Sequence, residues 1–309
     1  MSLVADVLSA TMLAQTLRMA VPYVCAALGG VWSERSGVVN IALEGMLLAS
    51  GFAAVAAQHA TGSAVIGVAA AVFMGALFAL VHAALFVWGR VDAIVSGIAL
   101  NLVAAGGTRF ALRALYDSSS NSPGVEGFRM AWLGGASGGM LLARTLLDPL
   151  TLLAAAATGV TVITMYSTRF GLRVRAAGEN PEAAQSLGVP VARVRILAVT
   201  LGGAICGLGG AALALDQHQF QSGMSGGRGF IALAAVIVSG WRPGRAALAC
   251  VLFAALDALQ IVAQDQAVVA RDLVQMLPYV ATLVTLTVLA ARRGNAAGSL
   301  APKGIGRHA

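Results

Sequence analysis

Long apolar stretches alternate with short polar ones along almost the whole chain. The apolar segments lie at 12–31, 38–58, 63–88, 94–115, 146–166, 196–215, 229–241, 246–263 and 273–291. An α-helix needs about 20 apolar residues to cross a bilayer. The pattern therefore predicts an all-α polytopic membrane protein with about nine transmembrane helices (eight to ten) in a single domain over residues 1–309. Two segments fit this rule less well: 38–58 starts in polar sequence, and 229–241 is short.

Composition supports this class and excludes others. The chain is 58% hydrophobic and 11% charged, whereas soluble domains have about 25% charged residues. The net charge of +7 comes from arginines in short loops and in the tail, as in membrane proteins, so we expect no nucleic-acid partner. Cys25, Cys206 and Cys250 lie in apolar segments without metal-ligand spacing, so neither a metal site nor a disulfide framework is expected.

Arginine placement predicts the orientation. Five arginines lie in the loop 167–195, and four basic residues lie in the tail 292–309. Lys and Arg are retained on the cytoplasmic side of membrane proteins. We therefore expect this loop and the tail to be cytoplasmic, the loop 116–145 to be external, and the N-terminus to be external if there are nine spans. The predicted location is the inner (plasma) membrane.

The loop 167–195 contains a short helix with recognisable ends. Asn180 is a good N-cap, Pro181 suits the first helical position, and Glu182 complements the helix dipole. Ala183 and Ala184 then favour helix, and Gly188 can end it in the left-handed conformation. So short a helix is marginal by itself in water, which predicts that it docks onto a partner.

The two halves of the chain share a pattern. Segment 12–31 ends with two glycines and is followed by polar sequence and a glycine-punctuated span, and segment 196–215 is followed by a similar stretch. The two blocks would enter the membrane from opposite sides. This predicts two inverted-topology repeats with broken helices.

Polar side chains inside the spans are candidate pathway residues, because they are costly in lipid. Asn40 and Glu44 are four residues apart and share a helix face. Glu44 has a second interpretation, in which it pairs with an arginine or with backbone amides and holds helices together.

Further candidates lie in later spans. Ser96 and Asn101 lie around the start of one span, Arg228 lies in a glycine-rich stretch, and Asp257 shares a face with Gln260 on another span. Arg228 has the alternative role of neutralising an intramembrane carboxylate. His82, alone among apolar neighbours, is expected to be a satisfied buried histidine.

The chain lacks the motifs of an enzyme. Lys303 is the single lysine and follows Pro302, so a phosphate-binding P-loop is impossible. No nucleophile–base arrangement is evident either. We therefore expect no enzymatic activity and no cofactor bound by this chain, and any ATP that drives it must be hydrolysed by another polypeptide.

Four polar or glycine-containing motifs follow one another along the chain: Ser33–Met46, Ile94–Asn101, Thr168–Pro181 and Gly227–Ile237. Together they resemble the permease subunits of nucleoside and simple-sugar ABC importers, within the group of ribose-type and branched-chain amino-acid permeases. The resemblance covers roughly residues 20–291. Ala42 departs from it, since glycine is common at that position.

The resemblance implies a permease that forms the membrane pathway for nucleosides or related ribosyl or simple-sugar substrates. Its implied partners are a second permease, a cytoplasmic ATPase dimer that uses ATP and Mg²⁺, and an external substrate-binding (lipo)protein. It also implies that 178–188 is the coupling helix, with Gly178 and Glu179 leading into it. The alternative is a secondary transporter driven by protons or sodium through Glu44 or Asp257.

Overall fold

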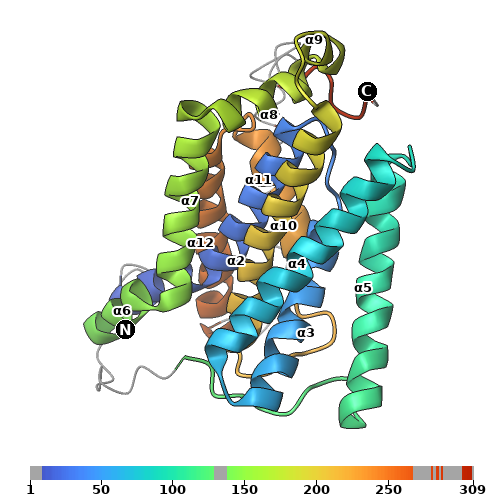
Figure 1. Cartoon of the computed structure of the whole chain (residues 1–309). Helices are drawn as coiled ribbons and strands as arrows, with labels where there is room; N and C mark the ends of the chain where they lie inside the picture. Colours follow the sequence, from blue (N-terminus) through green and yellow to red (C-terminus); the bar gives the residue numbers. More distant parts are fainter. Residues whose placement is uncertain are drawn as a thin grey trace.

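The computed structural model describes residues 9–128, 138–266, 280, 283, 284, 287 and 301–307, and within these it is helical, without strands. The only β-type pairing in that part of the chain is one bridge between Asn121 and Gln221. The helices are α2 (Ala10–Arg35), α3 (Leu43–Thr61), α4 (Ala64–Val87), α5 (Ala93–Tyr116), α6 (Gly138–Leu147), α7 (Pro149–Ser167), α8 (Arg169–Glu179), α9 (Pro181–Ser186), α10 (Val191–Asp216), α11 (Arg228–Val238) and α12 (Pro243–Gln266). Figure 1 shows α2, α10 and α11 in the middle of the bundle, with α8 and α9 at one end.

The helices agree with the apolar segments, with three exceptions. The span expected at 38–58 begins as a helix only at Leu43, because residues 36–42 leave the helical path. The expected external loop 116–145 contains the start of α6, and the expected cytoplasmic loop 167–195 contains α8 as well as α9. The span expected at 273–291 lies outside the described residues, apart from four single positions.

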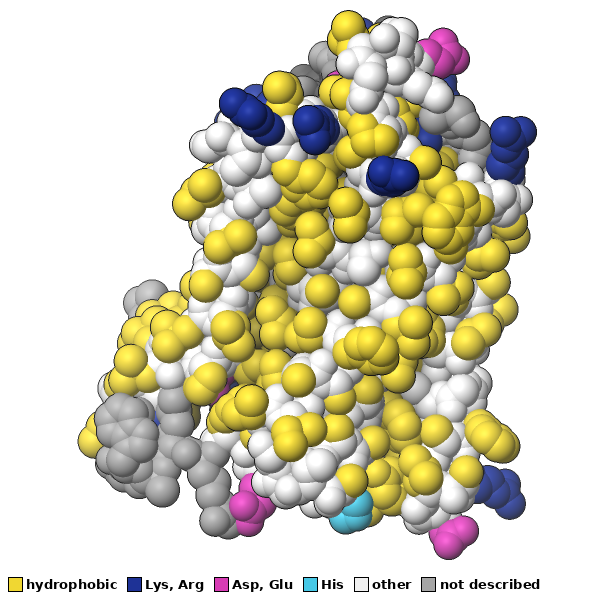
Figure 2. All heavy atoms as spheres, in the orientation of Figure 1, with side chains coloured by type: hydrophobic (Ala, Val, Ile, Leu, Met, Phe, Trp, Pro, Cys, Tyr) yellow, Lys and Arg dark blue, Asp and Glu magenta, His cyan; other side chains and the backbone are white. Residues whose placement is uncertain are grey.

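The surface is that of a protein embedded in lipid. By length and composition, α4, α5, α7, α10 and α12 are each able to cross a membrane. Large apolar side chains point outward, such as Phe110 with 75% of its surface exposed, which is unfavourable in water but not in lipid. Figure 2 shows a broad hydrophobic surface below dark blue Lys and Arg side chains, which gather at the end that carries α8 and α9.

Glycines let α10 pack closely against its neighbours. A Cβ atom on Gly75 of α4 would lie 2.3 Å from the Gly203 carbonyl oxygen of α10, and one on Gly207 would lie 2.4 Å from that of Ala71. Toward α2, a Cβ on Gly202 would lie 2.7 Å from the Gly29 carbonyl oxygen. Small residues spaced four apart allow such backbone contact between membrane helices. Glycine content at these positions therefore decides how the centre of the bundle packs.

Two non-helical segments interrupt the bundle. The first, 36–42, joins α2 to α3, and the second, 217–227, joins α10 to α11. The first segment reaches α5 beyond its first turn, where a Cβ on Gly97 would lie 3.2 Å from the Ala42 nitrogen. Irregular backbone inside a membrane protein needs internal hydrogen-bond partners, and polar side chains supply them at both segments.

Candidate functional site: two helix starts and an adjacent cavity

The first turns of α3 and α11 meet at Glu44. One carboxylate oxygen of Glu44 accepts a hydrogen bond from the Gly227 N–H and the other accepts one from the Gly229 N–H, both at 2.7 Å. The first N–H groups of a helix have no partner within the helix and carry the positive end of its dipole. A carboxylate on α3 therefore caps α11, about 185 residues away along the chain.

The first turn of α3 is held by neutral amides. The Asn40 side-chain oxygen accepts from the Ala42 N–H at 3.1 Å, and the Asn101 side-chain oxygen accepts from the Gly45 N–H at 2.7 Å. The Asn101 amide also donates to the Ile41 carbonyl at 3.0 Å. Asn101 on α5 thus binds a donor and an acceptor of the interrupted backbone at once.

Ser96 belongs to a third polar contact nearby. His82 Nε2 lies 2.8 Å from the Val39 carbonyl oxygen, and Ser96 Oγ lies 2.9 Å from His82 Nδ1. Because a carbonyl only accepts, Nε2 must carry the proton, and Nδ1 of the neutral ring accepts from the Ser96 hydroxyl. Both His82 nitrogens therefore have partners, as the sequence predicted.

A polar cavity of about 270 Å³ lies beside the start of α11. The Tyr23 hydroxyl donates to Asp257 at 2.7 Å. The Arg228 guanidinium lies 5.9 Å from the centre of the Tyr23 ring and donates to the Met224 carbonyl at 3.0 Å. The other residues that line the cavity are Met19, Gly226, Gln260 and Ile261.

The six predicted pathway residues thus fall into two groups. Arg228 and Asp257 share the cavity, whereas Asn40, Glu44, Ser96 and Asn101 make hydrogen bonds around the start of α3 and α11. The groups are adjacent, because Arg228 lies between the two residues whose N–H groups bind Glu44. Tyr23 was not predicted; its only signal is a phenol in the middle of the span 12–31.

The second predicted site lies at the α8–α9 end. The Asn180 side chain accepts from the Ala183 N–H at 3.0 Å, Pro181 is the first residue of α9, and Gly188 follows the helix with φ of +81°. The predicted helix and both of its ends are therefore confirmed. Leu187, just beyond α9, is 84% exposed.

The end of α8 is pressed against the end of α2. A Cβ atom on Gly178 would lie 2.2 Å from the Arg35 carbonyl oxygen, so only glycine fits there. Arg35 also forms an ion pair with Glu179 at 3.8 Å. These contacts connect the helical segment before α9 directly to a central helix of the bundle.

Arg195 was expected among the cytoplasmic arginines but is only 2% exposed. Its guanidinium donates to the Ser36 carbonyl at 3.1 Å and to the Ala177 carbonyl at 3.5 Å, and it lies 5.5 Å from the centre of the Phe86 ring. Arg195 therefore joins α10, the segment after α2 and the end of α8.

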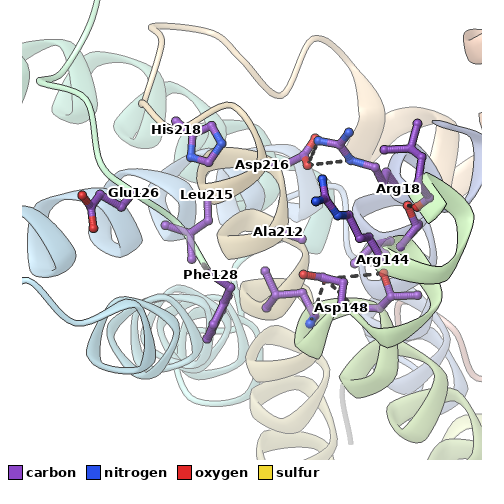
Figure 3. A pocket seen from close by; sticks show the side chains of 14 residues that line it. Arg18, Glu126, Phe128, Arg144, Asp148, Ala212, Leu215, Asp216 and His218 are labelled. Carbon is purple, nitrogen blue, oxygen red and sulfur yellow. Dashed lines mark hydrogen bonds and ion pairs between the residues drawn. The ribbon is translucent and has the colours of Figure 1, made fainter. Parts of the chain in front are cut away.

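A second cavity, of about 580 Å³, lies at the opposite end of the bundle. Figure 3 shows Arg18, Arg144, Asp148 and Asp216 along one side of it and Glu126, Phe128 and His218 along the other. Arg18 forms an ion pair with Asp216. Asp148 caps α7 by accepting from the Leu150 and Thr151 N–H groups at 3.0 and 3.1 Å.

Comparison with known proteins identifies the class. Residues 12–286 match the family described as "Branched-chain amino acid transport system / permease component". The chain belongs to this family, and it is a multi-pass integral protein of the plasma membrane.

Individual relatives are similar along nearly their whole length. The guanosine ABC transporter permease protein NupQ of Bacillus subtilis is 34% identical over 288 residues, which cover 88% of this chain and 89% of NupQ. The nucleoside ABC transporter permease protein NupC of Lactococcus lactis is 33% identical over 307 residues, 95% of this chain and 94% of NupC. A putative glucose ABC transporter permease protein of Haloferax volcanii, TsgC13, is 34% identical over 275 residues, 86% of this chain and 80% of that protein.

Proposed function

We propose that this chain is the permease subunit of an ATP-binding-cassette importer and forms the membrane pathway for nucleosides or related ribosyl or simple sugars. The observation that carries the proposal is the similarity to NupQ and NupC, which extends over about nine tenths of the chain. The chain is not an enzyme in this role, because ATP hydrolysis belongs to a separate subunit.

The cavity beside α11 is the proposed substrate pathway. It presents a carboxylate, a guanidinium, a phenol and an amide from Asp257, Arg228, Tyr23 and Gln260. Hydroxyl groups of a sugar need such donors and acceptors, and a nucleobase can stack on an aromatic ring. Glu44, Asn40, Asn101 and Ser96 would keep the adjacent helix starts in place, and Glu44 binds the two neighbours of Arg228, which lines the cavity.

The α9 region is the proposed docking site for the ATPase. The residues assigned to this coupling role are Gly178, Glu179, Asn180, Pro181, Glu182, Ala183, Ala184 and Gly188. The exposed Leu187 supports this assignment, since an apolar side chain at the tip of a capped helix is suited to enter an apolar cleft of a partner.

A mechanical route connects the two sites. Motion of α9 would be transmitted through Gly178 to the end of α2 at Arg35. Tyr23 lies twelve residues before Arg35 on the same helix, about 18 Å away along the helix axis. Tilting α2 would therefore move one wall of the cavity.

The complete assembly would contain two permease subunits, a cytoplasmic ATPase dimer and an external substrate-binding protein. We also propose nine spans with inverted-topology repeats and an external N-terminus. The two interrupted pairs, α2 with α3 and α10 with α11, support the repeat, since each is a long helix followed by a non-helical segment and a second helix.

The test is uptake of labelled guanosine and ribose by proteoliposomes that contain the chain with its ATPase, partner permease and binding protein. We expect uptake to need ATP and to continue when proton and sodium gradients are collapsed. The variant Leu187→Asp should lose co-purification of the ATPase, and Leu187→Met should retain it. Uptake that needs an ion gradient but no ATP would contradict the proposal and favour a secondary transporter.

A further inference from the structure

The C-terminal segment 301–307 folds back onto the α8–α9 end of the bundle (Figure 1). The Gly304 N–H donates to the Gly178 carbonyl and the Gly306 N–H donates to the Gly37 carbonyl, both at 2.8 Å. Pro302 and Gly304 are buried there. Two backbone hydrogen bonds therefore tie this segment to the end of α8 and to the break after α2.

The segment also touches the first residue of α9. A Cβ atom on Gly304 would lie 2.7 Å from Pro181 Cδ and 2.8 Å from the Gly178 carbonyl oxygen. The Lys303 N–H lies 3.5 Å from a carboxylate oxygen of Glu179. The segment thus packs across the joint between α8 and α9.

The joint between α8 and α9 is a point at which the chain can bend. Asn180, the single residue between the two helices, has extended backbone angles (φ −150°, ψ 93°). A force on α9 would bend such a joint before it moved α2, unless another contact held the two helices together. Residues 301–307 are placed to provide that contact.

We propose that residues 301–307 brace the α8–α9 joint, so that motion of a docked ATPase reaches α2 instead of bending the chain at Asn180. The inference rests on the proposed function. Lys303 and Arg307 of this segment are exposed. Gly304 is a positioning residue in this arrangement, since it acts through Pro181 and Gly178.

The test compares two glycine-to-alanine variants in the reconstituted transporter. Gly304→Ala adds a Cβ into the brace, whereas Gly159→Ala adds one where no atom lies within 4 Å. We expect Gly304→Ala to lower the substrate transported per ATP hydrolysed by about fivefold or more, a typical size for coupling between sites. Gly159→Ala should leave this ratio unchanged, and both variants should still co-purify with the ATPase.

A second variant lacks residues 301–309 and should lower the same ratio at least as far. If both variants transport the normal amount of substrate per ATP hydrolysed, the inference is wrong. It is also wrong if melting temperature, transport and ATP hydrolysis all fall in parallel, because that result indicates a structural role only. Failure of the unsubstituted chain to bind an ATPase, or to transport with ATP, would instead overturn the proposed function.

Discussion

The two helix starts that meet inside the bundle are held in different ways. The start of α3 is fixed by Asn40 from its own segment and by Asn101 from α5. The start of α11 takes both of its side-chain hydrogen bonds from one residue, Glu44. Two side chains support the α3 start, whereas the α11 start depends on a single side chain and borders the cavity.

The backbone before each helix shows the same contrast. In the segment before α3, only Gly37 has a left-handed backbone among residues 36–42, whereas Gly223, Gly226, Gly227 and His218 all have one in the segment before α11. Such glycine-rich backbone has few conformational restraints of its own. We infer that the start of α11 is the more easily displaced of the two, as an element beside the proposed substrate pathway needs to be.

The substitution Glu44→Ala should lower the stability of the protein most, because the start of α11 depends on Glu44 alone. It leaves two backbone N–H groups without partners, at a cost of about 2–6 kcal/mol in the free energy of unfolding. A thiol-reactive dye can follow thermal unfolding, because Cys25, Cys206 and Cys250 are all buried. Glu44→Gln keeps one acceptor oxygen and should lose less. Equal melting temperatures for Glu44→Ala and the unsubstituted protein would refute the capping role.

The variant Gly229→Ala tests the same contact from the α11 side. Its Cβ would lie 2.4 Å from the Glu44 nitrogen and 2.6 Å from its Cα. Because backbone atoms yield little, we expect a loss of up to about 3 kcal/mol. Gly106→Ala, where the Cβ meets no atom within 4 Å, serves as the control. If both variants melt at the same temperature, α11 tolerates displacement at no cost.

The variant Asn101→Ala should have a smaller effect. Two neutral hydrogen bonds are lost, worth about 2 kcal/mol together, and Asn40 still binds the Ala42 N–H just before α3. The double variant Asn40→Ala/Asn101→Ala should then lose more than the sum of the single losses, because the support is shared. Strict additivity in the same melting assay would show that the two amides act separately.

Tyr23→Phe should give the smallest change in stability, about 1 kcal/mol, since a single hydroxyl bond to Asp257 is lost. Its effect on transport should be larger, with a raised KM for uptake if the cavity lies on the pathway. Thr158→Val is the matched control, because it also removes one hydroxyl hydrogen bond, to the Ala154 carbonyl, at a position that does not line the cavity. An unchanged KM for Tyr23→Phe would show that the Tyr23 hydroxyl has no role in the pathway.

Local features of the chain could be predicted from the sequence. Apolar segment length located the helices, and the caps of α9 were predicted residue by residue, because both depend on neighbours within a few positions. Helix α8 was missed because its buried positions, Gly171, Val174 and Ala177, are small and lie among arginines.

The long-range contacts could not be predicted in the same way. Glu44 binds backbone N–H groups, and the sequence of the partner segment does not show which of its N–H groups are bound. Arg195 looks like any other arginine near a membrane surface, yet its guanidinium binds the carbonyls of Ser36 and Ala177. The two hydrogen bonds that tie 301–307 to Gly178 and Gly37 are likewise made between backbone atoms. In each of these bonds the partner is a main-chain group whose position only the fold determines.

The glycines of α10 have a genetic consequence. A Cβ atom on Gly203 would lie 2.1 Å from the Ala79 side chain and 2.4 Å from the Gly75 carbonyl oxygen. Every other amino acid carries a Cβ, so no missense change at this codon is conservative. In a saturation library of the gene, position 203 should therefore tolerate synonymous changes alone, while exposed Leu201, two residues earlier, accepts many apolar replacements.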